Sequence, residues 1–264
     1  MGYEYLDVAD EENGLRVLTL NRPERMNSWH AQMRQELRDA VDQAAVDPDL
    51  RVLVVTGAGG KAFSAGEDVS GMADLTAIGT RGFRAQARRI HEVFDTIEAI
   101  EVPVIAAIEG VAAGGGFELA LSCDFRIAGE SARFVMPEAK VGLIPGSGGC
   151  SRLVQHVGLA RAKELVMLGG TLRPPQAEAL GLVTEVVPDG GALDAARAMA
   201  QRLAKLAPLA LGMAKLVLNT CADVDAETGR RLERLGQSVL KTTDDHAEGA
   251  RAFLEKRPAA WQAR

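Results

Sequence analysis

The sequence lacks the features that define several large classes of protein. Its 264 residues include only three cysteines, Cys123, Cys150 and Cys221, which are too few and too scattered for a disulfide framework or a metal cluster. No apolar run reaches the ~18 residues that a transmembrane helix needs. The first ten residues are acidic and contain no apolar segment typical of a signal peptide. These absences predict a protein of a reducing, cytoplasmic compartment with no membrane partner.

An excess of positive charge is also missing. The chain has 30 Lys and Arg against 36 Asp and Glu, a net charge of −6, whereas non-specific binding to nucleic acid requires a basic field. No nucleic-acid partner is therefore expected, although a local basic patch could bind a small anion. Hydrophobic residues make up 47% and charged residues 25% of the chain, as in ordinary globular proteins of one large domain or two. The 28 glycines predict many tight turns and close backbone contacts.

Several well-known catalytic motifs are incomplete. Gly57-Ala58-Gly59-Gly60-Lys61-Ala62 fits the glycine pattern of a dinucleotide site, but the loop continues and Gly66 opposes the helix start that such a site needs. No Gly-Lys-Ser/Thr sequence of a P-loop and no H-E-x-x-H sequence occur. Pro145 replaces a required glycine of a nucleophile elbow around Ser147. The four histidines are isolated, so we expect them at the surface or at helix caps.

Short apolar runs alternate with amphipathic segments, which predicts an α/β fold with βαβ crossovers. After about residue 190 only helices are expected. The strands are predicted at residues 15–20, 52–56, 104–108, 125–128 and 133–136, and the helices at residues 27–45, 82–99 and 115–123. Asn27 or Ser28 is the expected N-cap of the first helix. Residues 57–71 are predicted to form a loop, and Ile90, Phe94 and Ile97 are expected to point inward.

Two glycine-rich segments follow the second and third predicted strands. They are Ser64-Ala65-Gly66-Glu67-Asp68 and the segment from Gly110 to Glu118, which contains Gly114-Gly115-Gly116. Ligands of parallel sheets collect beyond the carboxyl ends of the strands, and a helix that opens with glycines exposes its first amides. One N–H group from each loop could form an oxyanion hole. Alternatively, the glycines only allow a helix to pack closely against a strand.

Two glutamates lie near these segments. Glu118 falls in the first turn of a predicted helix, where it could simply interact with the helix N-terminus. Glu138 follows Pro137 and precedes the glycine-rich residues 142–149, where it could be a solvated loop carboxylate. An apolar setting would instead raise the pKa of such a carboxyl group. Two carboxyl groups that face one substrate can divide the roles of acid and base.

Together these segments show a resemblance that covers nearly the whole chain. The sequence resembles the crotonase superfamily, specifically enoyl-CoA hydratases. The similar segments are residues 21–27, 62–68, 110–124, 137–149 and 248–257. The resemblance implies a spiral of repeated ββα units in residues 1–195 and a C-terminal helical region, residues 196–264, that mediates trimerisation. It also implies an acyl-CoA substrate and a homotrimer or a dimer of trimers.

The resemblance implies catalytic roles for four residues. The oxyanion-hole amides would come from Glu67 and Gly115, and Glu118 and Glu138 would be the two glutamates of hydratases. The position of Glu67 is often alanine in the family, so its carboxylate could narrow the acyl pocket or add polarity. Isomerases of the superfamily often keep only the second glutamate, so the presence of both favours hydration.

The resemblance also implies how CoA is bound, with no metal or redox cofactor. Arg25 and Lys256, and Lys61 as a further candidate, would meet the CoA phosphates. Backbone contacts to the rest of CoA would involve Ser64, Ala65, Gly66, Asp68 and Gly114. Residues 70–88 would line the acyl pocket, so the sequence leaves the acyl chain length open. An enoyl-CoA isomerase, another crotonase-type lyase and a non-catalytic acyl-CoA-binding protein are the alternatives to a hydratase.

Overall fold

The computed structural model describes residues 2–68, 70 and 79–264. Residues 69 and 71 of the loop predicted for residues 57–71, and residues 71–78 of the stretch 70–88 expected to line an acyl pocket, lie outside the described residues. The side chain of Ile90, which the periodicity directs inward, also lies outside them.

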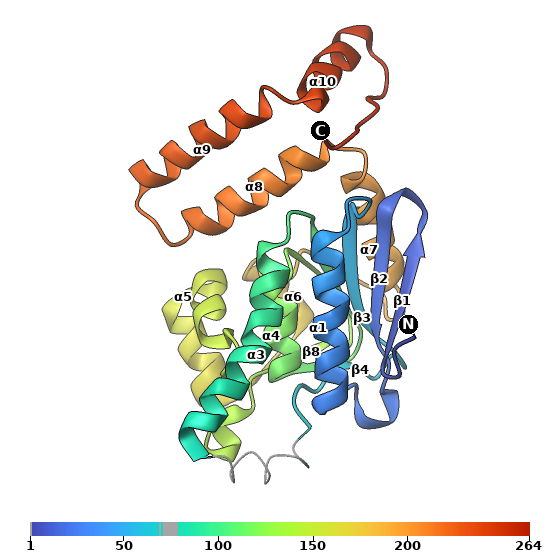
Figure 1. Ribbon diagram of the computed structural model, residues 1–264. Coiled ribbons are helices and arrows are strands. Elements are labelled where there is room, and N and C mark those ends of the chain that lie inside the picture. Colours follow the sequence, from blue (N-terminus) through green and yellow to red (C-terminus); the bar gives the residue numbers. More distant parts are fainter. Residues whose placement is uncertain (1, 69, 71–78) are drawn as a thin grey trace.

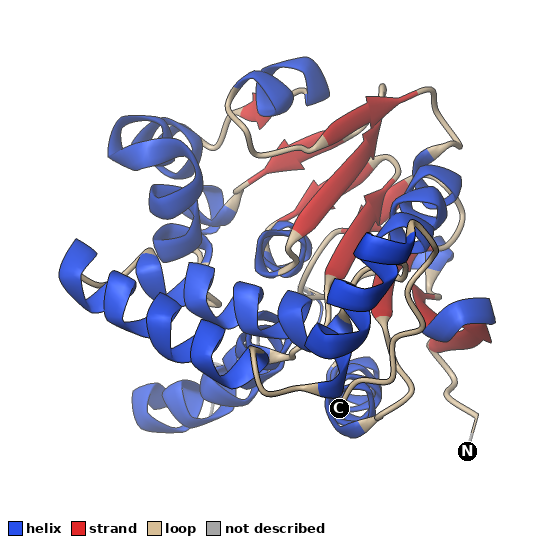
Figure 2. Cartoon of the chain, turned by 90° about the horizontal axis from the view of Figure 1, so that it is seen from above, coloured by secondary structure: helices blue, strands red, loops and turns tan. Residues whose placement is uncertain are grey.

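Two β-sheets form the framework of the protein, and helices lie on both sides of the strands (Figures 1 and 2). The six-stranded sheet has the order β1-β2-β3-β5-β7-β10, and the four-stranded sheet has the order β4-β6-β8-β9. Neighbouring strands are parallel except for the pairs β1/β2 and β8/β9. The strands are β1 (Leu6–Glu11), β2 (Leu15–Leu20), β3 (Val52–Gly57), β4 (Ala62–Ser64), β5 (Val104–Ile108), β6 (Val111–Ala113), β7 (Phe125–Gly129), β8 (Arg133–Val135), β9 (Thr171–Leu172) and β10 (Glu185–Val187).

From β3 to β8, successive strands alternate between the two sheets. The pairs β3/β4, β5/β6 and β7/β8 each give their first strand to the six-stranded sheet and their second to the four-stranded sheet. Helices follow these pairs, so the spiral of ββα units is confirmed. The helices are α1 (Ala31–Val46), α3 (Gly79–Ala99), α4 (Gly115–Ser122), α5 (Gly149–Leu168), α6 (Pro174–Ala179), α7 (Ala192–Leu203), α8 (Pro208–Cys221), α9 (Ala226–Leu240) and α10 (Asp244–Glu255). Short 3₁₀ turns are η1 (Glu12–Gly14), η2 (Pro23–Arg25) and η4 (Glu138–Val141).

Strand β3 is buried on both faces, as its continuous apolar run predicts. Val52 and Val54 pack in the smaller core cluster, which includes buried residues of α7. Leu53 and Val55 pack in the larger cluster, which includes residues of α1, α3 and α4. Because side chains alternate along a strand, helices must cover both faces of the sheet. This layering leaves the ends of the strands, rather than their faces, open for a site.

Helix α1 begins later than the sequence predicts. Its N-cap is His30, whose ring nitrogen accepts a hydrogen bond of 3.2 Å from the first-turn amide of Met33. The prediction of Asn27 or Ser28 as the cap is wrong. The Asn27 side chain instead donates 2.8 Å and 3.0 Å hydrogen bonds to carbonyl groups of the chain after β3, because it is buried and needs partners there. His30 fulfils the expectation that a histidine caps a helix.

The loop predicted for residues 57–71 contains a strand, β4, and the sequence-based prediction also omitted β1, β6, β9 and β10. Most of these strands have two or three residues, too few for an alternating pattern to be recognised. Strands β4, β6 and β8 pair with one another, so they are stabilised by partners distant in the sequence. The five strands that were predicted are all confirmed, with ends that differ by at most one residue.

Helices α8, α9 and α10 form an arm that projects from the body (Figure 1). The ion pair of Lys215 on α8 with Asp124 measures 2.9 Å and joins the arm to the body. The predicted division between residues 195 and 196 lies inside α7, which packs against the six-stranded sheet, and the division stays a prediction. None of the described helices is alone long and apolar enough to span a membrane, although α7 and α8, bent by 109° at the break between them, together have the length and composition to do so.

Candidate active site

Two loops touch at positions where only glycine fits. Gly66 follows β4 and has a φ of +80°, and a Cβ atom on it would lie 2.7 Å from the backbone nitrogen of Gly115. A Cβ atom on Gly116 would lie 2.2 Å from the carbonyl oxygen of Ser64. The glycines therefore allow close backbone packing, as one interpretation of the sequence proposed. The same contact brings Glu67 and Gly115, the two predicted amide donors, into neighbouring loops.

The amides of Glu67 and Gly115 are free at this contact. Neither donates a hydrogen bond to another residue in the described part of the chain. Trp29 and Glu67 form a parallel bridge. In this bridge Trp29 N donates to Gly66 O at 2.8 Å, and Asp68 N donates to Trp29 O at 2.9 Å. The Glu67 amide takes no part in the bridge and points away from Trp29. Gly115 begins α4, where an amide has no acceptor within the helix. Two such amides can stabilise negative charge on an oxygen atom.

Glu118 lies in the first turn of α4 and is only 3% exposed. Its Oε1 accepts hydrogen bonds from the amides of Ser147 and Gly149, at 2.7 Å and 2.9 Å, rather than from its own helix. Burial raises the pKa of Glu118, while these two hydrogen bonds and the charges of His91 and Arg152 oppose the rise. The carboxyl group is therefore held in a fixed orientation by the turn before α5.

Glu138 begins the turn η4 after β8. Its Oε1 lies 3.0 Å from the position that a Cβ atom on Gly114 would occupy, so the carboxyl group faces the start of α4. Its Oε2 is buried and has no hydrogen-bond partner among the described residues. Burial raises the pKa of Glu138, and the nearby charge of Glu118 raises it further. A partly buried carboxyl group with an unpaired oxygen and a perturbed pKa is typical of a functional site.

The two glutamates have different environments. The hydrogen bonds from two amides favour the ionised form of Glu118. No group donates to Oε2 of Glu138 within the described structure, and the charge of Glu118 opposes ionisation of Glu138. This arrangement favours the ionised form more strongly at Glu118 than at Glu138. Such a pair can act as a base and an acid on one substrate.

Arg152 supports the turn that binds Glu118, and no sequence motif predicts this role. Its Nη1 donates to the carbonyl oxygen of Ser147 at 2.8 Å, while Nε and Nη2 bind both carboxylate oxygens of Glu98, at 2.9 Å and 2.7 Å. Nη2 also binds Asp95 at 3.0 Å. Only its place in the first turn of α5, shortly after a glycine-rich segment, would have pointed to Arg152.

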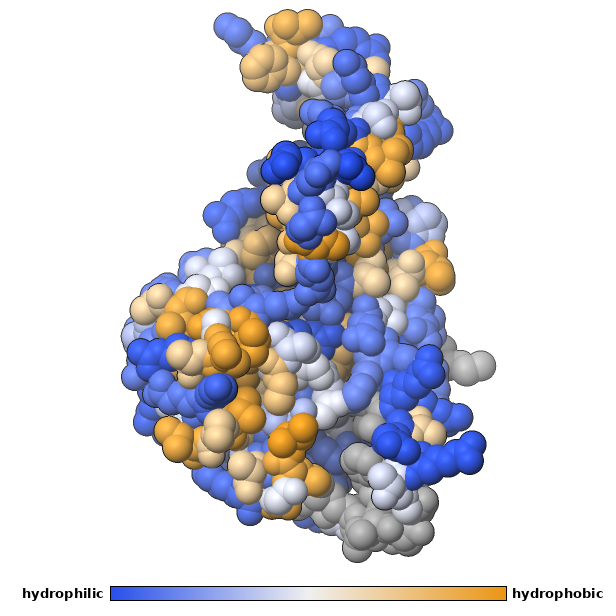
Figure 3. All heavy atoms as spheres, turned by 90° about the vertical axis from the view of Figure 1, so that its left-hand side faces the viewer, coloured by the Kyte–Doolittle hydropathy of each residue, from blue (hydrophilic) through white to orange (hydrophobic). Residues whose placement is uncertain are grey.

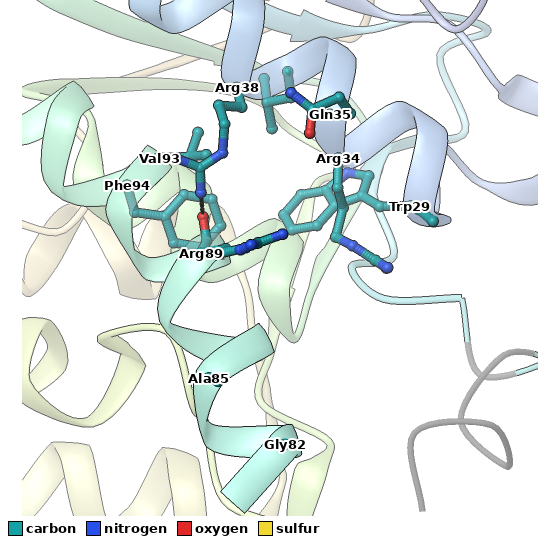
Figure 4. A pocket seen from close by; sticks show the side chains of 11 residues that line it. Trp29, Arg34, Gln35, Arg38, Gly82, Ala85, Arg89, Val93 and Phe94 are labelled. Carbon is teal, nitrogen blue, oxygen red and sulfur yellow. Dashed lines mark hydrogen bonds between the residues drawn. The ribbon is translucent and has the colours of Figure 1, made fainter. Parts of the chain in front are cut away.

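A cavity of about 520 Å³ lies beside the two loops, between α1 and α3 (Figure 4). Trp29 and Arg34 belong to its wall and also contact the site. The Trp29 ring lies 3.0 Å from the position of a Cβ atom on Gly115, and Arg34 forms an ion pair with Glu67. The remaining wall is lined by Ala31, Gln35, Leu37, Arg38, Gly82, Ala85, Arg89, Val93 and Phe94.

Comparison with known proteins identifies the family. Residues 10–264 match the family model described as "Enoyl-CoA hydratase/isomerase". The chain belongs to the enoyl-CoA hydratase/isomerase family. It is 39% identical to the crotonyl-CoA hydratase of Syntrophomonas wolfei, over 98% of each chain, and 35% identical to the 2,3-dehydroadipyl-CoA hydratase of Escherichia coli, over 97% of this chain and 98% of the other. The crystal structure of an enoyl-CoA hydratase from Bacillus anthracis superimposes with a TM-score of 0.93 at 35% identity, covering 99% of this chain and 100% of that one.

The residues predicted to contact CoA through their backbone lie in two segments of this member of the enoyl-CoA hydratase/isomerase family. Ser64, Ala65, Gly66 and Asp68 lie in the loop after β4, and Gly114 lies directly before α4. Arg22 forms an ion pair of 2.7 Å with Asp68. Hydrogen bonds from Ser70, together with Arg22, hold the pKa of Asp68 well below its usual range, so Asp68 is ionised and anchors the loop.

The three basic residues predicted to bind the CoA phosphates do not all lie together within one chain. Arg25 and Lys61 are exposed, and the turn η2 that contains Arg25 packs at Gly59, because a Cβ atom there would lie 2.7 Å from Pro23. Lys256 is the C-cap that follows α10, and α10 lies in the arm, far from β4 (Figure 1). One chain therefore brings Arg25 and Lys61 to the same side but not Lys256. No group of three metal-binding side chains occurs within the described ranges.

Proposed function

We propose that the protein is an enoyl-CoA hydratase, which adds water across the 2,3 double bond of an enoyl-CoA thioester. The observation that carries this proposal is the combination of a buried glutamate, Glu118, and a half-buried one, Glu138, with two free amides on touching loops. The hydratases among the relatives support the same reaction class.

The free amides would bind the thioester carbonyl oxygen. As water adds to C3, electrons of the double bond move toward this oxygen and give it enolate character. The amides of Glu67 and Gly115 would stabilise that charge, and each donor in such a hole contributes ~3–4 kcal/mol to lowering the barrier. The positive end of α4 at Gly115 adds to the effect.

The glutamates would transfer the protons. Ionised Glu118 takes a proton from water while the water oxygen bonds to C3, and protonated Glu138 gives its proton to C2. The product is a 3-hydroxyacyl-CoA, and passage of the proton from Glu118 to Glu138 restores the starting state. Positioned proton transfer of this kind contributes about 10²–10⁴-fold.

Product analysis with a panel of 2-enoyl and 3-enoyl CoA thioesters tests the proposal. We expect 3-hydroxyacyl-CoA from crotonyl-CoA. Conversion of a 3-enoyl-CoA to a 2-enoyl-CoA without addition of water would instead show an isomerase. Tight binding of acyl-CoA without turnover would show a binding protein.

We also propose that the protein assembles as a homotrimer or a dimer of trimers through its C-terminal helices. Phe253 and Leu254 on α10 are 84% and 81% exposed, and further exposed apolar side chains lie on α8 and α9 (Leu218, Leu235 and Val239). Apolar side chains gather on the arm and on the body in the view of Figure 3. Patches of this kind are typical of interfaces. A stable monomer in light scattering at micromolar concentration would contradict the assembly.

The remaining expectations belong to the same proposal. An acyl-CoA bound by Arg25, Lys61 and Lys256 through its phosphates would need Lys256 of a neighbouring copy, which the assembly could supply. A cytoplasmic location stays a prediction.

A further inference from the structure

The position that supplies the first oxyanion-hole amide carries a carboxylate in this protein. Glu67 contributes a free amide at the contact of the two loops, and its side chain is 28% exposed. A carboxylate in this setting would repel an enolate oxygen bound to the amide of the same residue, because charges in a partly buried site are weakly screened. The carboxylate of Glu67 would thus destabilise the enolate, whereas an apolar side chain at this position would not.

Arg34 contacts this carboxylate from a different element. Its guanidinium group forms an ion pair and a hydrogen bond with Oε1 of Glu67. The Arg34 side chain is 16% exposed, so the pair is sheltered from water. Figure 4 shows Arg34 extending from α1 next to Trp29, at the edge of the cavity.

The segment before α1 places Arg34 at this point. Trp29 is joined to the loop that contains Glu67 by the two backbone hydrogen bonds of its bridge with Glu67, and α1 begins two residues later. Arg34 lies in the first turn of α1. The backbone that orients the Glu67 amide therefore also fixes the distance from Glu67 to Arg34.

The other charged groups that influence Glu67 are already engaged. Asp68 is paired with Arg22 at 2.7 Å, and a ring nitrogen of His30 accepts the cap hydrogen bond of α1. Burial and the charge of Asp68 raise the pKa of Glu67, and Arg34 is the largest influence that lowers it. Among the described residues, Arg34 is the cation in direct contact with Glu67.

We propose that Arg34 is a positioning residue that neutralises Glu67 and keeps its carboxylate on the α1 side of the loop, so that the enolate forms beside an ion pair. This inference rests on the proposed hydratase function. Glu67 and Arg34 act together, and the glutamate is tolerated beside the oxyanion hole because the arginine is present.

The test compares Arg34→Met with the double variant Arg34→Met/Glu67→Gln on crotonyl-CoA. Removal of Arg34 leaves a bare carboxylate beside the enolate, so kcat should fall about ten-fold while KM changes less than about two-fold. Replacing Glu67 as well removes the repulsion and should restore kcat to within about three-fold of the wild type. A merely structural role of Arg34 would not be rescued by a second substitution.

Arg16→Met is the matched control. The side chain of Arg16 on β2 is 15% exposed, close to the value for Arg34, and it pairs with Asp10 and Asp47 at 2.6 Å and 2.8 Å, not with Glu67. Its substitution should leave kcat and KM unchanged. Arg34→Lys keeps the charge and should retain most of kcat.

The pH dependence gives a second readout. Without Arg34 the pKa of Glu67 rises, so the side chain becomes neutral as the pH falls and the kcat defect of Arg34→Met relative to the double variant should shrink. The comparison cancels the titration of Glu118 and Glu138, which both variants share. A defect of the same size at every pH would contradict the proposal.

Other results would also overturn the inference. Wild-type kcat in Arg34→Met, or a double variant as slow as Arg34→Met, would show that the pair has no such role. If Arg34→Met fails to fold, Glu67→Gln alone tests whether the carboxylate is merely tolerated at this position. This variant should keep kcat within about three-fold of the wild type. A ten-fold loss would show that the carboxylate itself serves the reaction. Hydration of crotonyl-CoA by the wild type separates these outcomes from failure of the proposed function, which would remove the inference with it.

Discussion

Arg152 and Glu118 are connected through one residue. Arg152 donates a 2.8 Å hydrogen bond to the carbonyl oxygen of Ser147, and the amide of Ser147 donates a 2.7 Å hydrogen bond to Oε1 of Glu118. The arginine is itself held by Glu98 and Asp95 of α3. The orientation of the proposed base therefore depends on Arg152, whose side chain forms hydrogen bonds with Ser147, Glu98 and Asp95 rather than with Glu118 itself.

Arg152→Met should lower hydratase kcat about ten-fold or more, because the turn that orients Glu118 loses its support. The half-buried carboxylate of Glu98 also loses its buried partner, so the melting temperature should fall. Steady-state kinetics and thermal melts of the same preparation measure both effects. Normal kcat in a destabilised variant would show that the turn holds its shape without Arg152.

Glu118→Gln and Glu138→Gln should each lower kcat for crotonyl-CoA by about 10²-fold or more, since neither amide can exchange a proton as a carboxyl group does. The double variant should be less than additively impaired, because both groups serve one transition state. Circular dichroism should show folded protein in each case. Retention of most hydration by Glu118→Gln would contradict the two-glutamate mechanism.

Glu138→Gln should also raise the melting temperature at pH 8. The folded protein raises the pKa of Glu138, so the stability linked to this group is present at low pH and is lost as the pH rises through the folded pKa. Gln avoids that loss, and its advantage should disappear as the pH falls toward the ordinary pKa of glutamic acid. The exposed Glu130→Gln is the control and should leave the melting temperature unchanged across this range.

Gly66→Ala should destabilise the protein and its active site together. The residue has a φ of +80°, and the added Cβ atom would lie 2.7 Å from Gly115 N, so backbone strain and overpacking should together lower the free energy of unfolding by ~2–4 kcal/mol. Activity should fall in the remaining folded protein, because the contact positions both amides. Gly60→Ala has a similar φ of +68° but no atom within 4 Å. It should show the strain alone, and equal losses in the two variants would argue against the loop contact.

Arg25→Ala and Lys256→Ala should raise KM for crotonyl-CoA with little change in kcat, as expected when binding is lost equally in the ground and transition states. The increase should be larger at low than at high ionic strength, since salt screens contacts with phosphates. Arg202→Ala, an exposed arginine at the end of α7, provides a charge-matched control. A large fall in kcat at unchanged KM would show that the assignment to CoA is wrong.

The sequence alone determined the parts of the protein that depend on local patterns. The run Val52 to Thr56 predicted a strand buried on both faces, and the change to helices after residue 190 was visible as a change of period. Glycines before Glu118 and around Gly66 were recognised as places of close approach. The resemblance to a family predicts that these segments form one site. Strands of two or three residues, such as β9, carry no such local signal.

Only the tertiary structure decided which groups meet. That Glu118 accepts hydrogen bonds from Ser147 and Gly149, and that Oε2 of Glu138 is left without a partner, depends on how α4, α5 and the turn η4 pack. The ion pair of Arg34 with Glu67 joins residues 33 positions apart, and no period in the sequence relates them. Hydrogen bonds and ion pairs of this kind arise from distances in the folded chain, whereas the sequence records only the order of the residues that make them.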